Sequence, residues 1–298
     1  MDIERLAERL YELFDELHAS ADEVLERVEV ALAVAEQRLL AGVSGELAGV
    51  LPATFAGMTL DERVAWYLEN SPDADQLLRE SGYYAVVAEY VSAFDGLAAA
   101  AYALAAAAGV EGFPGGAPQA FLDFVKQREY AHLAFLGQEA SMRVADVVSS
   151  MTLGGSSAVA LMDALRGAIT GDYAWGQGRG LYSWHAGTYV RTELMRVIRE
   201  FVAAQADRDG VSLFMYVGPL DSKTRPFCAR VMLGKMVYSR EEIDSMDNGQ
   251  TGDVMTDGGG YNCRHSWMPV TAEFAAAVAG APEVVRDAAR NSTVEEGD

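Results

Sequence analysis

The feature that most constrains this chain is a long helical pattern at its start. Residues 3–41 contain neither glycine nor proline, and their apolar side chains recur at intervals of four and three residues. The stripe consists of Leu6, Leu10, Leu13, Leu17, Val24, Val28, Ala31 and Ala35. At about 1.5 Å per residue, the pattern predicts a helix of roughly 58 Å. Such a length is typical of a coiled coil or a docking arm, but the stripe can also pack on helices of its own chain, and the sequence leaves both interpretations open.

Helical patterns continue to about residue 206. Thr59 and Glu62 have the spacing of a capping box at the start of a helix. A segment rich in glycine and proline, 109–119, separates a helical docking region, 1–110, from a second helical region, 119–206. The helices expected in the second region span 119–150, begin at a cap on Ser156 or Ser157, and span about 186–206.

The pattern changes beyond residue 206. Three short β-prone runs, 212–217, 235–238 and 265–270, are separated by turns and a polar glycine-rich loop. They predict a small α+β module over 207–271, followed by short helices and an acidic tail over 272–298. The expected fold is therefore mainly α, with a long N-terminal helical region followed by a small α+β C-terminal module that has a few short strands.

Charge and composition exclude several classes of protein. The formal net charge of −21 argues against a general nucleic-acid binder and against attachment to an anionic membrane. The most apolar stretch, Gly96–Val110, is shorter than the ~20 residues that span a bilayer. The acidic, amphipathic start does not have the pattern of a signal peptide, and two cysteines do not make a disulfide framework. We therefore expect a soluble protein made in a reducing cytosol, with no membrane partner.

The two cysteines are the first candidates for chemistry. Cys263 is followed by Arg264 and His265, and Cys228 lies 35 residues upstream. Alternate residues of a strand share a face, so Cys263 and His265 can both point inward. A structural zinc needs four ligands, and Asp221 or a water molecule would have to be the fourth. A cysteine nucleophile with His265 as its base is a second interpretation, but no glycine-rich oxyanion loop stands beside either cysteine.

A structural clasp is the third interpretation and the one we favour. In it, Cys228 pairs with or packs against Cys263, while Arg264 reaches Asp221 or Glu193. A module with three short strands has little core, so such a staple would matter to its stability. Asp221 follows a strand and a Gly-Pro break, a place where aspartate most often closes a turn.

The 186–206 segment adds a charged helix face. It carries Arg191-Thr192-Glu193, with Arg196 and Arg199 on neighbouring turns. Because Arg196 and Glu200 are four residues apart, they can pair on the helix surface. The plain interpretation is a solvated face with weak ion pairs, and the sharper one is an arginine stripe that binds phosphate or a partner's carboxylates.

Three segments, in order, resemble the Mu-F-like minor head, or head-morphogenesis, proteins of tailed bacteriophages. They are Arg191-Thr192-Glu193, the run "LDSKTRPFCARVMLGKMV" and the run "GGGYNCRHSWMPV". The resemblance covers roughly residues 186–271. The matching residues are Arg191, Glu193, Asp221, Thr224, Cys228, Gly234, Lys235, Asn262, Cys263 and Arg264. Arg225 stands where many relatives have a further cysteine, Gly260-Tyr261 stand in place of His-Pro, and His265 replaces a final cysteine, so the thiol and imidazole ligands number three rather than four.

The resemblance implies a structural virion protein without enzymatic activity. Such a minor capsid protein would help to assemble the head near the portal vertex and accompany DNA packaging or ejection. The implied partners are the portal protein, the major capsid or scaffolding protein and packaged DNA, with self-association through the N-terminal helix. The implied location is the virion head, and the host cytoplasm during assembly. The alternative is a small metal-dependent hydrolase or nuclease module that uses Asp221, Cys228, Cys263 and His265.

Overall fold

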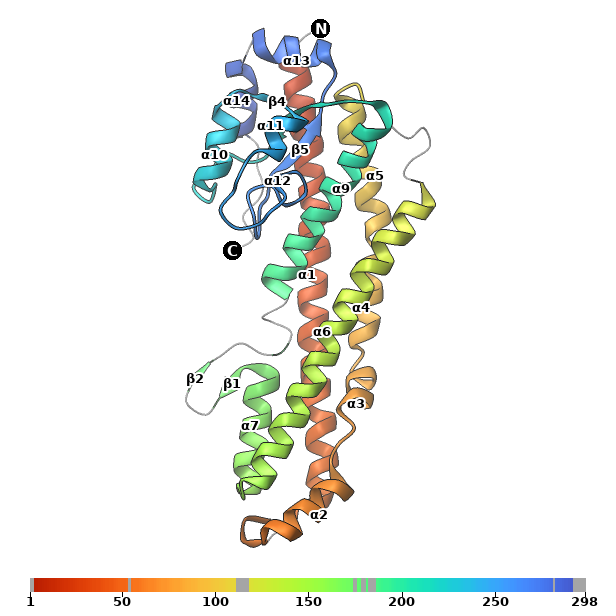
Figure 1. Ribbon diagram of the computed structural model, residues 1–298, viewed down its shortest axis with the longest axis vertical. Coiled ribbons are helices and arrows are strands. Elements are labelled where there is room, and N and C mark those ends of the chain that lie inside the picture. Colours follow the sequence, from red (N-terminus) through yellow and green to blue (C-terminus); the bar gives the residue numbers. More distant parts are fainter. Residues whose placement is uncertain are drawn as a thin grey trace. The chain divides into compact units, whose positions relative to one another are not determined.

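The computed structural model describes residues 3–52, 55–110, 118–173, 176–177, 181, 186–280 and 282–291. Helices dominate these residues, and a three-stranded antiparallel sheet lies in the C-terminal part of the chain (Figure 1). The predicted fold class, mainly α with a small α+β C-terminal module, is confirmed. Most of the break expected at 109–119, most of the connector before residue 186 and the acidic end of the tail lie outside the described residues.

Helix α1 (Ile3–Val50) is the long N-terminal helix that the sequence predicts, and it continues past the predicted end at residue 41. The extension has a physical cause, because Val43 and Leu47 prolong the apolar stripe and both side chains are fully buried. Packing of this kind outweighs the low helix propensity of Gly42, Gly45 and Gly49 in this stretch. The helix ends just before Pro52, whose ring would clash with a further helical turn.

The stripe of α1 is buried by the chain itself, one of the two interpretations that the sequence left open. Leu10, Phe14 and Leu17 are buried in its first part. Ala35 and Leu39 are buried in its second part. A helix surface that is already covered in this way contributes to the core.

The described fold divides into two compact units. Unit 1 contains Met1–Leu25, Ala93–Val125 and Thr188–Asp298, and unit 2 contains Glu26–Ser92 and Lys126–Gly187. The ranges predicted from the sequence, 1–110, 119–206, 207–271 and 272–298, follow the chain in order, whereas each unit is assembled from separate segments.

Unit 2 is built from helices around the second part of α1 and residues 126–153 of α6 (Gln119–Leu153). Its other elements are η1 (Phe55–Gly57), α2 (Leu60–Asn70), α3 (Ala74–Glu80), α4 (Tyr83–Ser92), α7 (Ala158–Thr170), and the hairpin strands β1 (Asp172–Tyr173) and β2 (Gly176–Gln177). The predicted capping box of Thr59 and Glu62 is present, and Ser157 caps α7. The Tyr83 hydroxyl donates to the Leu133 carbonyl at 2.7 Å, which fixes α4 against α6.

Unit 1 combines the first part of α1 with helix α5 (Phe94–Ala107), helix α9 (Arg191–Asp209) and the sheet. Helix α9 packs against both α5 and β5. A short π-helix, η2 (Ala186–Val190), precedes α9. The remaining elements are α10 (Pro226–Leu233), α11 (Arg240–Asp244), α12 (Val254–Asp257), α13 (Ala272–Gly280) and α14 (Pro282–Asn291).

The sheet of unit 1 has the order β4-β3-β5, and both pairings are antiparallel. The strands are β3 (Leu213–Val217), β4 (Val237–Ser239) and β5 (Ser266–Pro269). β3 and β5 lie within their predicted runs, and β4 overlaps the run 235–238 and ends one residue beyond it. In the central strand, Tyr216 is opposite Trp267, and their rings lie 4.5 Å apart. This register brings β3 next to the segment that contains both Cys263 and His265.

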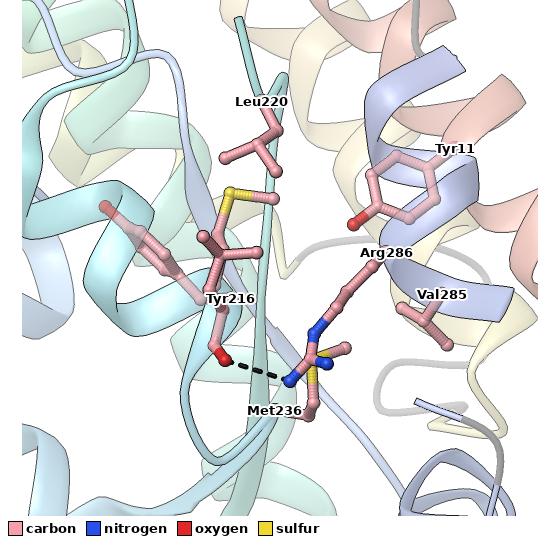
Figure 2. Close-up of a pocket in the computed structure, with 8 residues that line it drawn as sticks. Tyr11, Tyr216, Leu220, Met236, Val285 and Arg286 are labelled. Atoms are coloured by element: carbon pink, nitrogen blue, oxygen red, sulfur yellow. Dashed lines mark hydrogen bonds between the residues drawn. The ribbon is translucent and has the colours of Figure 1, made fainter. Parts of the chain in front are cut away.

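A small cavity of about 10 Å³ lies between residues of α1, β3, α10 and α14 (Figure 2). Tyr11, Tyr216, Met236 and Arg286 are among the residues that line it. Arg286 donates to the Leu233 carbonyl at 2.9 Å, which ties α14 to the end of α10. The volume suits about one water molecule and no larger ligand.

One helical stretch of the described chain, Leu60–Ala107, contains a window that is long and apolar enough to cross a membrane. Within the structure, this stretch is divided into α2, α3, α4 and α5, and 44% of the window is buried. Core helices of soluble proteins reach the same length and apolar composition.

Candidate functional site: a buried thiol and imidazole cluster

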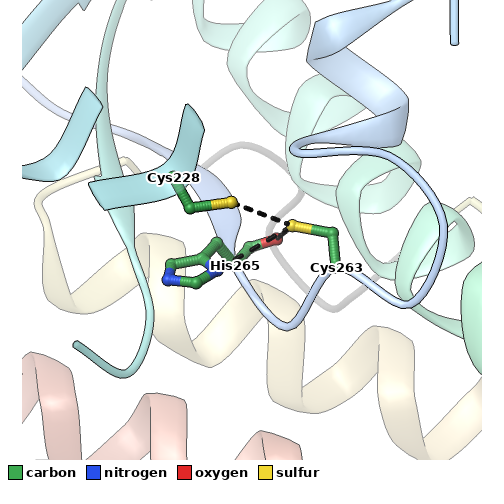
Figure 3. Close-up of side chains that lie close together, drawn as sticks. All are labelled: Cys228, Cys263 and His265. Atoms are coloured by element: carbon green, nitrogen blue, oxygen red, sulfur yellow. Dashed lines mark hydrogen bonds between the residues drawn. The ribbon is translucent and has the colours of Figure 1, made fainter. Parts of the chain in front are cut away.

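Cys228, Cys263 and His265 lie together in the interior of unit 1 (Figure 3). The two sulfur atoms are 3.8 Å apart, and Cys263 Sγ is 3.8 Å from His265 Nδ1. Their relative exposures are 1%, 4% and 2%, so substrate cannot reach them without a local opening. Both cysteines are free thiols. The structure thus brings together three of the four residues that the sequence singled out.

The ring of His265 is held in one orientation. Its Nε2 lies 2.9 Å from the Pro219 carbonyl, which can only accept a hydrogen bond. In the neutral ring, Nε2 therefore carries the proton, and the lone pair of Nδ1 points at Cys263. A metal-binding histidine uses its second nitrogen in the same way, because the hydrogen bond to a carbonyl fixes the tautomer.

Tyr216 is part of this cluster, although no signal in the sequence indicates it. Its hydroxyl lies 3.3 Å from Cys263 Sγ and 3.6 Å from Cys228 Sγ. Its ring stacks on that of His265, with centroids 5.3 Å apart and planes 14° from parallel. A tyrosine on a predicted strand normally reads as core, so only the register of β3 and β5 identifies this contact.

Two glycines allow the backbone to approach the cluster. A Cβ on Gly259 would lie 2.3 Å from Cys228 Sγ, and a Cβ on Gly218 would lie 2.4 Å from the His265 ring. Gly259 also donates its backbone N–H to Cys263 Sγ at 3.1 Å. Any side chain at these two positions would push Cys228 or His265 out of its place in the cluster.

The two thiols form a coupled pair. Hydrogen bonding from Cys228 lowers the pKa of Cys263, and the positive charge of Arg199 acts in the same direction. The same hydrogen bond, together with burial, raises the pKa of Cys228. Burial also raises the pKa of Tyr216 well above its usual value. Cys263 is therefore the more acidic thiol of the pair.

Arg199 holds the loops that carry the cluster. It is only 1% exposed, and it donates to the carbonyls of Thr256, Cys263 and His265 at 2.7–3.0 Å. The interpretation of a solvated arginine face does not apply to this residue, because its guanidinium lies in the core. Its neighbour Arg196 bridges Glu193 and Asp257, and the charge of the expected Glu200 also acts on it.

Asp221 stands outside the thiol cluster and closes a turn. Its two carboxylate oxygens accept hydrogen bonds from Arg264 at 2.6 and 2.7 Å. Oδ1 also accepts from the Lys223 backbone N–H and the Thr224 hydroxyl. These bonds, with that of Arg264 the largest, lower the pKa of Asp221 far below its usual value. The clasp interpretation expects Arg264 to reach Asp221 or Glu193, and the contact with Asp221 is present.

The other motif residues also make contacts within unit 1. Arg191 pairs with Asp22 of α1 at 3.0 Å. The Thr192 hydroxyl accepts from the Asn262 backbone N–H at 3.0 Å, and Asn262 adopts a left-handed conformation with φ of 56°. Lys235 pairs with Glu242 at 2.6 Å. Gly234 lies against Tyr238, whose hydroxyl would be 2.8 Å from an added Cβ.

The donor set fits a soft divalent metal such as zinc. With Zn–S near 2.3 Å and Zn–N near 2.05 Å, tetrahedral geometry separates two sulfurs by about 3.8 Å and sulfur from nitrogen by about 3.6 Å. The observed separations along the two edges that share Cys263 Sγ are both 3.8 Å. All three ligand atoms lie within 4.8 Å of one another. Asp221, by contrast, is already bound by Arg264 and is not a suitable fourth ligand.

Comparison with known proteins returned no matching family, no similar curated protein and no similar solved structure.

Proposed function

We propose that this chain is a structural minor head protein of a tailed phage, without an enzymatic role of its own. It would act near the portal vertex in head assembly, and in DNA packaging or ejection, with the virion head and the assembling host cytoplasm as its locations. The supporting observation is that the three segments of the phage resemblance, far apart in sequence, interlock within unit 1.

The interlocking uses the motif side chains themselves. Thr192 of the first segment binds the backbone of Asn262 in the third, and Arg264 of the third segment binds Asp221 in the second. Cys228 and Cys263 join the second and third segments at 3.8 Å. These residues are therefore engaged in holding the fold, which supports a scaffold more than a catalyst.

A partner needs an exposed surface, and helix α2 of unit 2 offers one. Leu60, Val64 and Leu68 are 56%, 38% and 76% exposed, and their spacing of four residues places them on one side of the helix. The opposite side is anchored by Trp66, which is buried and donates to the Val50 carbonyl at 3.0 Å. An aliphatic face of this kind suits a protein interface.

We take the portal protein as the occupant of this face. Helix α2 carries the carboxylates of Asp61, Glu62 and Glu69, and its only base is Arg63, which is bound to the Met58 and Leu153 carbonyls. The matching portal segment would have apolar residues flanked by lysine or arginine, because complementary charge favours the encounter. The predicted apolar stripe of α1, in contrast, is largely buried.

Co-expression with the portal protein encoded by the same phage tests this proposal. We expect co-purification of the wild-type chain, and at least a roughly tenfold loss of it in the double variant L60S/L68S, since each buried aliphatic is worth about 1.5–3 kcal/mol. The variant V30S is the control, because Val30 is an equally exposed aliphatic on a different helix. Failure of the wild type to bind the portal protein, together with its absence from purified virions, would refute the assignment.

The metal-dependent hydrolase or nuclease remains a weaker proposal. It would need Asp221, Cys228, Cys263 and His265 at one accessible metal, but Asp221 is bound by Arg264 and the other three are buried. A catalytic metal keeps an open coordination position for water or substrate. Metal-dependent cleavage of a phosphodiester or ester by the wild-type chain, abolished in H265N, would revive this function.

A further inference from the structure

The hydroxyl of Tyr216 lies beside both sulfurs of the thiol and imidazole cluster. It is 3.3 Å from Cys263 Sγ and 3.6 Å from Cys228 Sγ. With Zn–S near 2.3 Å and Zn–O near 2.0 Å, tetrahedral geometry separates sulfur from oxygen by about 3.5 Å. The S···S separation of 3.8 Å also equals the tetrahedral value of about 3.8 Å. Together with the 3.8 Å between Cys263 Sγ and His265 Nδ1, four of the edges of a tetrahedron are close to the lengths of a zinc site.

The ligand atoms are also fixed by the fold before any ion binds. His265 is oriented by Pro219 through Nε2, which leaves Nδ1 facing Cys263. Tyr216 is held by strand β3 and by stacking on the His265 ring. Gly259 supplies an N–H to Cys263 Sγ, a bond that stabilises a metal-bound thiolate as well as a free one.

We propose that Cys228, Cys263, His265 and Tyr216 form a closed tetrahedral site for zinc. Two sulfurs and an imidazole select a soft or borderline ion over magnesium or calcium, which prefer oxygen ligands. All four side chains are buried, so no position is left open for substrate. The site is therefore structural, and it fastens α10, β3 and the loop before β5 to one ion. This inference does not depend on the assignment to a phage head.

Cobalt replacement tests the proposal on the full-length chain. The protein is purified, stripped with a chelator and titrated with Co²⁺ alone, and the expected result is one ion per chain with the intense visible bands of tetrahedral cobalt bound to thiolate. In Y216F, these bands should shift, and cobalt affinity should fall by roughly tenfold or more, as for other losses around a metal site. Y261F is the control, because Tyr261 lies in the same loop region with its ring about half exposed.

Two outcomes would overturn the proposal. One is a folded wild-type chain that binds neither Co²⁺ nor Zn²⁺ at micromolar concentration. The other is a Y216F variant whose cobalt spectrum and affinity equal those of Y261F, which would mean that Tyr216 is not a ligand. Should Y216F fail to fold, diffraction at the zinc edge from the wild-type crystal locates the ion directly, and a Tyr216 oxygen outside the first coordination shell refutes the site. Metal content is measured without the portal protein, so this test and the co-purification test fail independently.

Discussion

Replacement of Arg199 by methionine is the sharpest test of what holds the C-terminal module together. Methionine keeps much of the hydrocarbon of the side chain but removes every donor, so the carbonyls of Thr256, Cys263 and His265 lose their hydrogen bonds from Arg199. Each buried carbonyl without a partner costs about 1–3 kcal/mol. Relief from burying a charge offsets part of the sum. We expect R199M to lower the free energy of unfolding by about 3–5 kcal/mol.

Urea unfolding, followed by far-ultraviolet circular dichroism, measures this loss. The control is R240M, because Arg240 forms an exposed pair with Asp244 four residues away on the short helix α11. A pair of that kind is worth only about 0.3–0.5 kcal/mol. At roughly 2 °C per kcal/mol for a chain of this length, R199M should also melt about 6–10 °C lower. If R199M and R240M unfold at the same urea concentration, the carbonyls do not depend on Arg199 and the reasoning is wrong.

Two further changes probe the same unit. Burial is the main cause that lowers the pKa of His18 from 6.5 to about 3, and the positive charge of Arg199 acts in the same direction. The unfolded chain binds this proton more readily, so the contribution of His18 to stability is complete above pH 6.5 and declines as the pH falls towards 3. At pH 5 this contribution to the free energy of unfolding is about 2 kcal/mol smaller than at neutral pH, and the variant H18Q should not show this loss. If the stability of H18Q and of the wild type fell equally between pH 7 and pH 5, the prediction would be wrong. Gly259→Ala places a Cβ 2.3 Å from Cys228 Sγ and should destabilise the chain by about 1–3 kcal/mol, whereas Gly252→Ala, with no atom within 4 Å, should not. Similar unfolding midpoints for these two variants would show that the cluster can move aside.

The sequence predicted the helices and strands well, because their signals are local. The apolar stripe of α1, the capping box at Thr59 and the three β-prone runs each depend on residues close together in the chain. The end of α1 was harder to predict, since glycines argued for a stop while burial of Val43 and Leu47 kept the helix going.

The site was predictable only in part, for a related reason. Cysteine and histidine are rare in this chain, so composition alone drew attention to Cys228, Cys263 and His265. Arg199 and Tyr216 have no such signal, because an arginine on a helix and a tyrosine on a strand are ordinary residues until tertiary packing buries them. The sequence suggests Asp221 as a fourth ligand, but its carboxylate pairs with Arg264. This pairing depends on how close the two loops lie, which local sequence patterns do not show.

The way in which unit 1 gathers its segments has a consequence for synthesis on the ribosome. Residues 1–25 belong to the same compact unit as residues 188–298, whereas unit 2 has all of its residues once residue 187 has emerged. At about 5–20 residues per second, residues 1–25 therefore wait roughly 10–50 seconds for residues 188–298 of their unit. During that interval Leu10, Phe14 and Leu17 lack part of their native neighbours, and incompletely packed apolar side chains of this kind favour binding by chaperones. Truncation at the carboxyl end would thus leave the earliest part of the chain, rather than the latest, without its native neighbours.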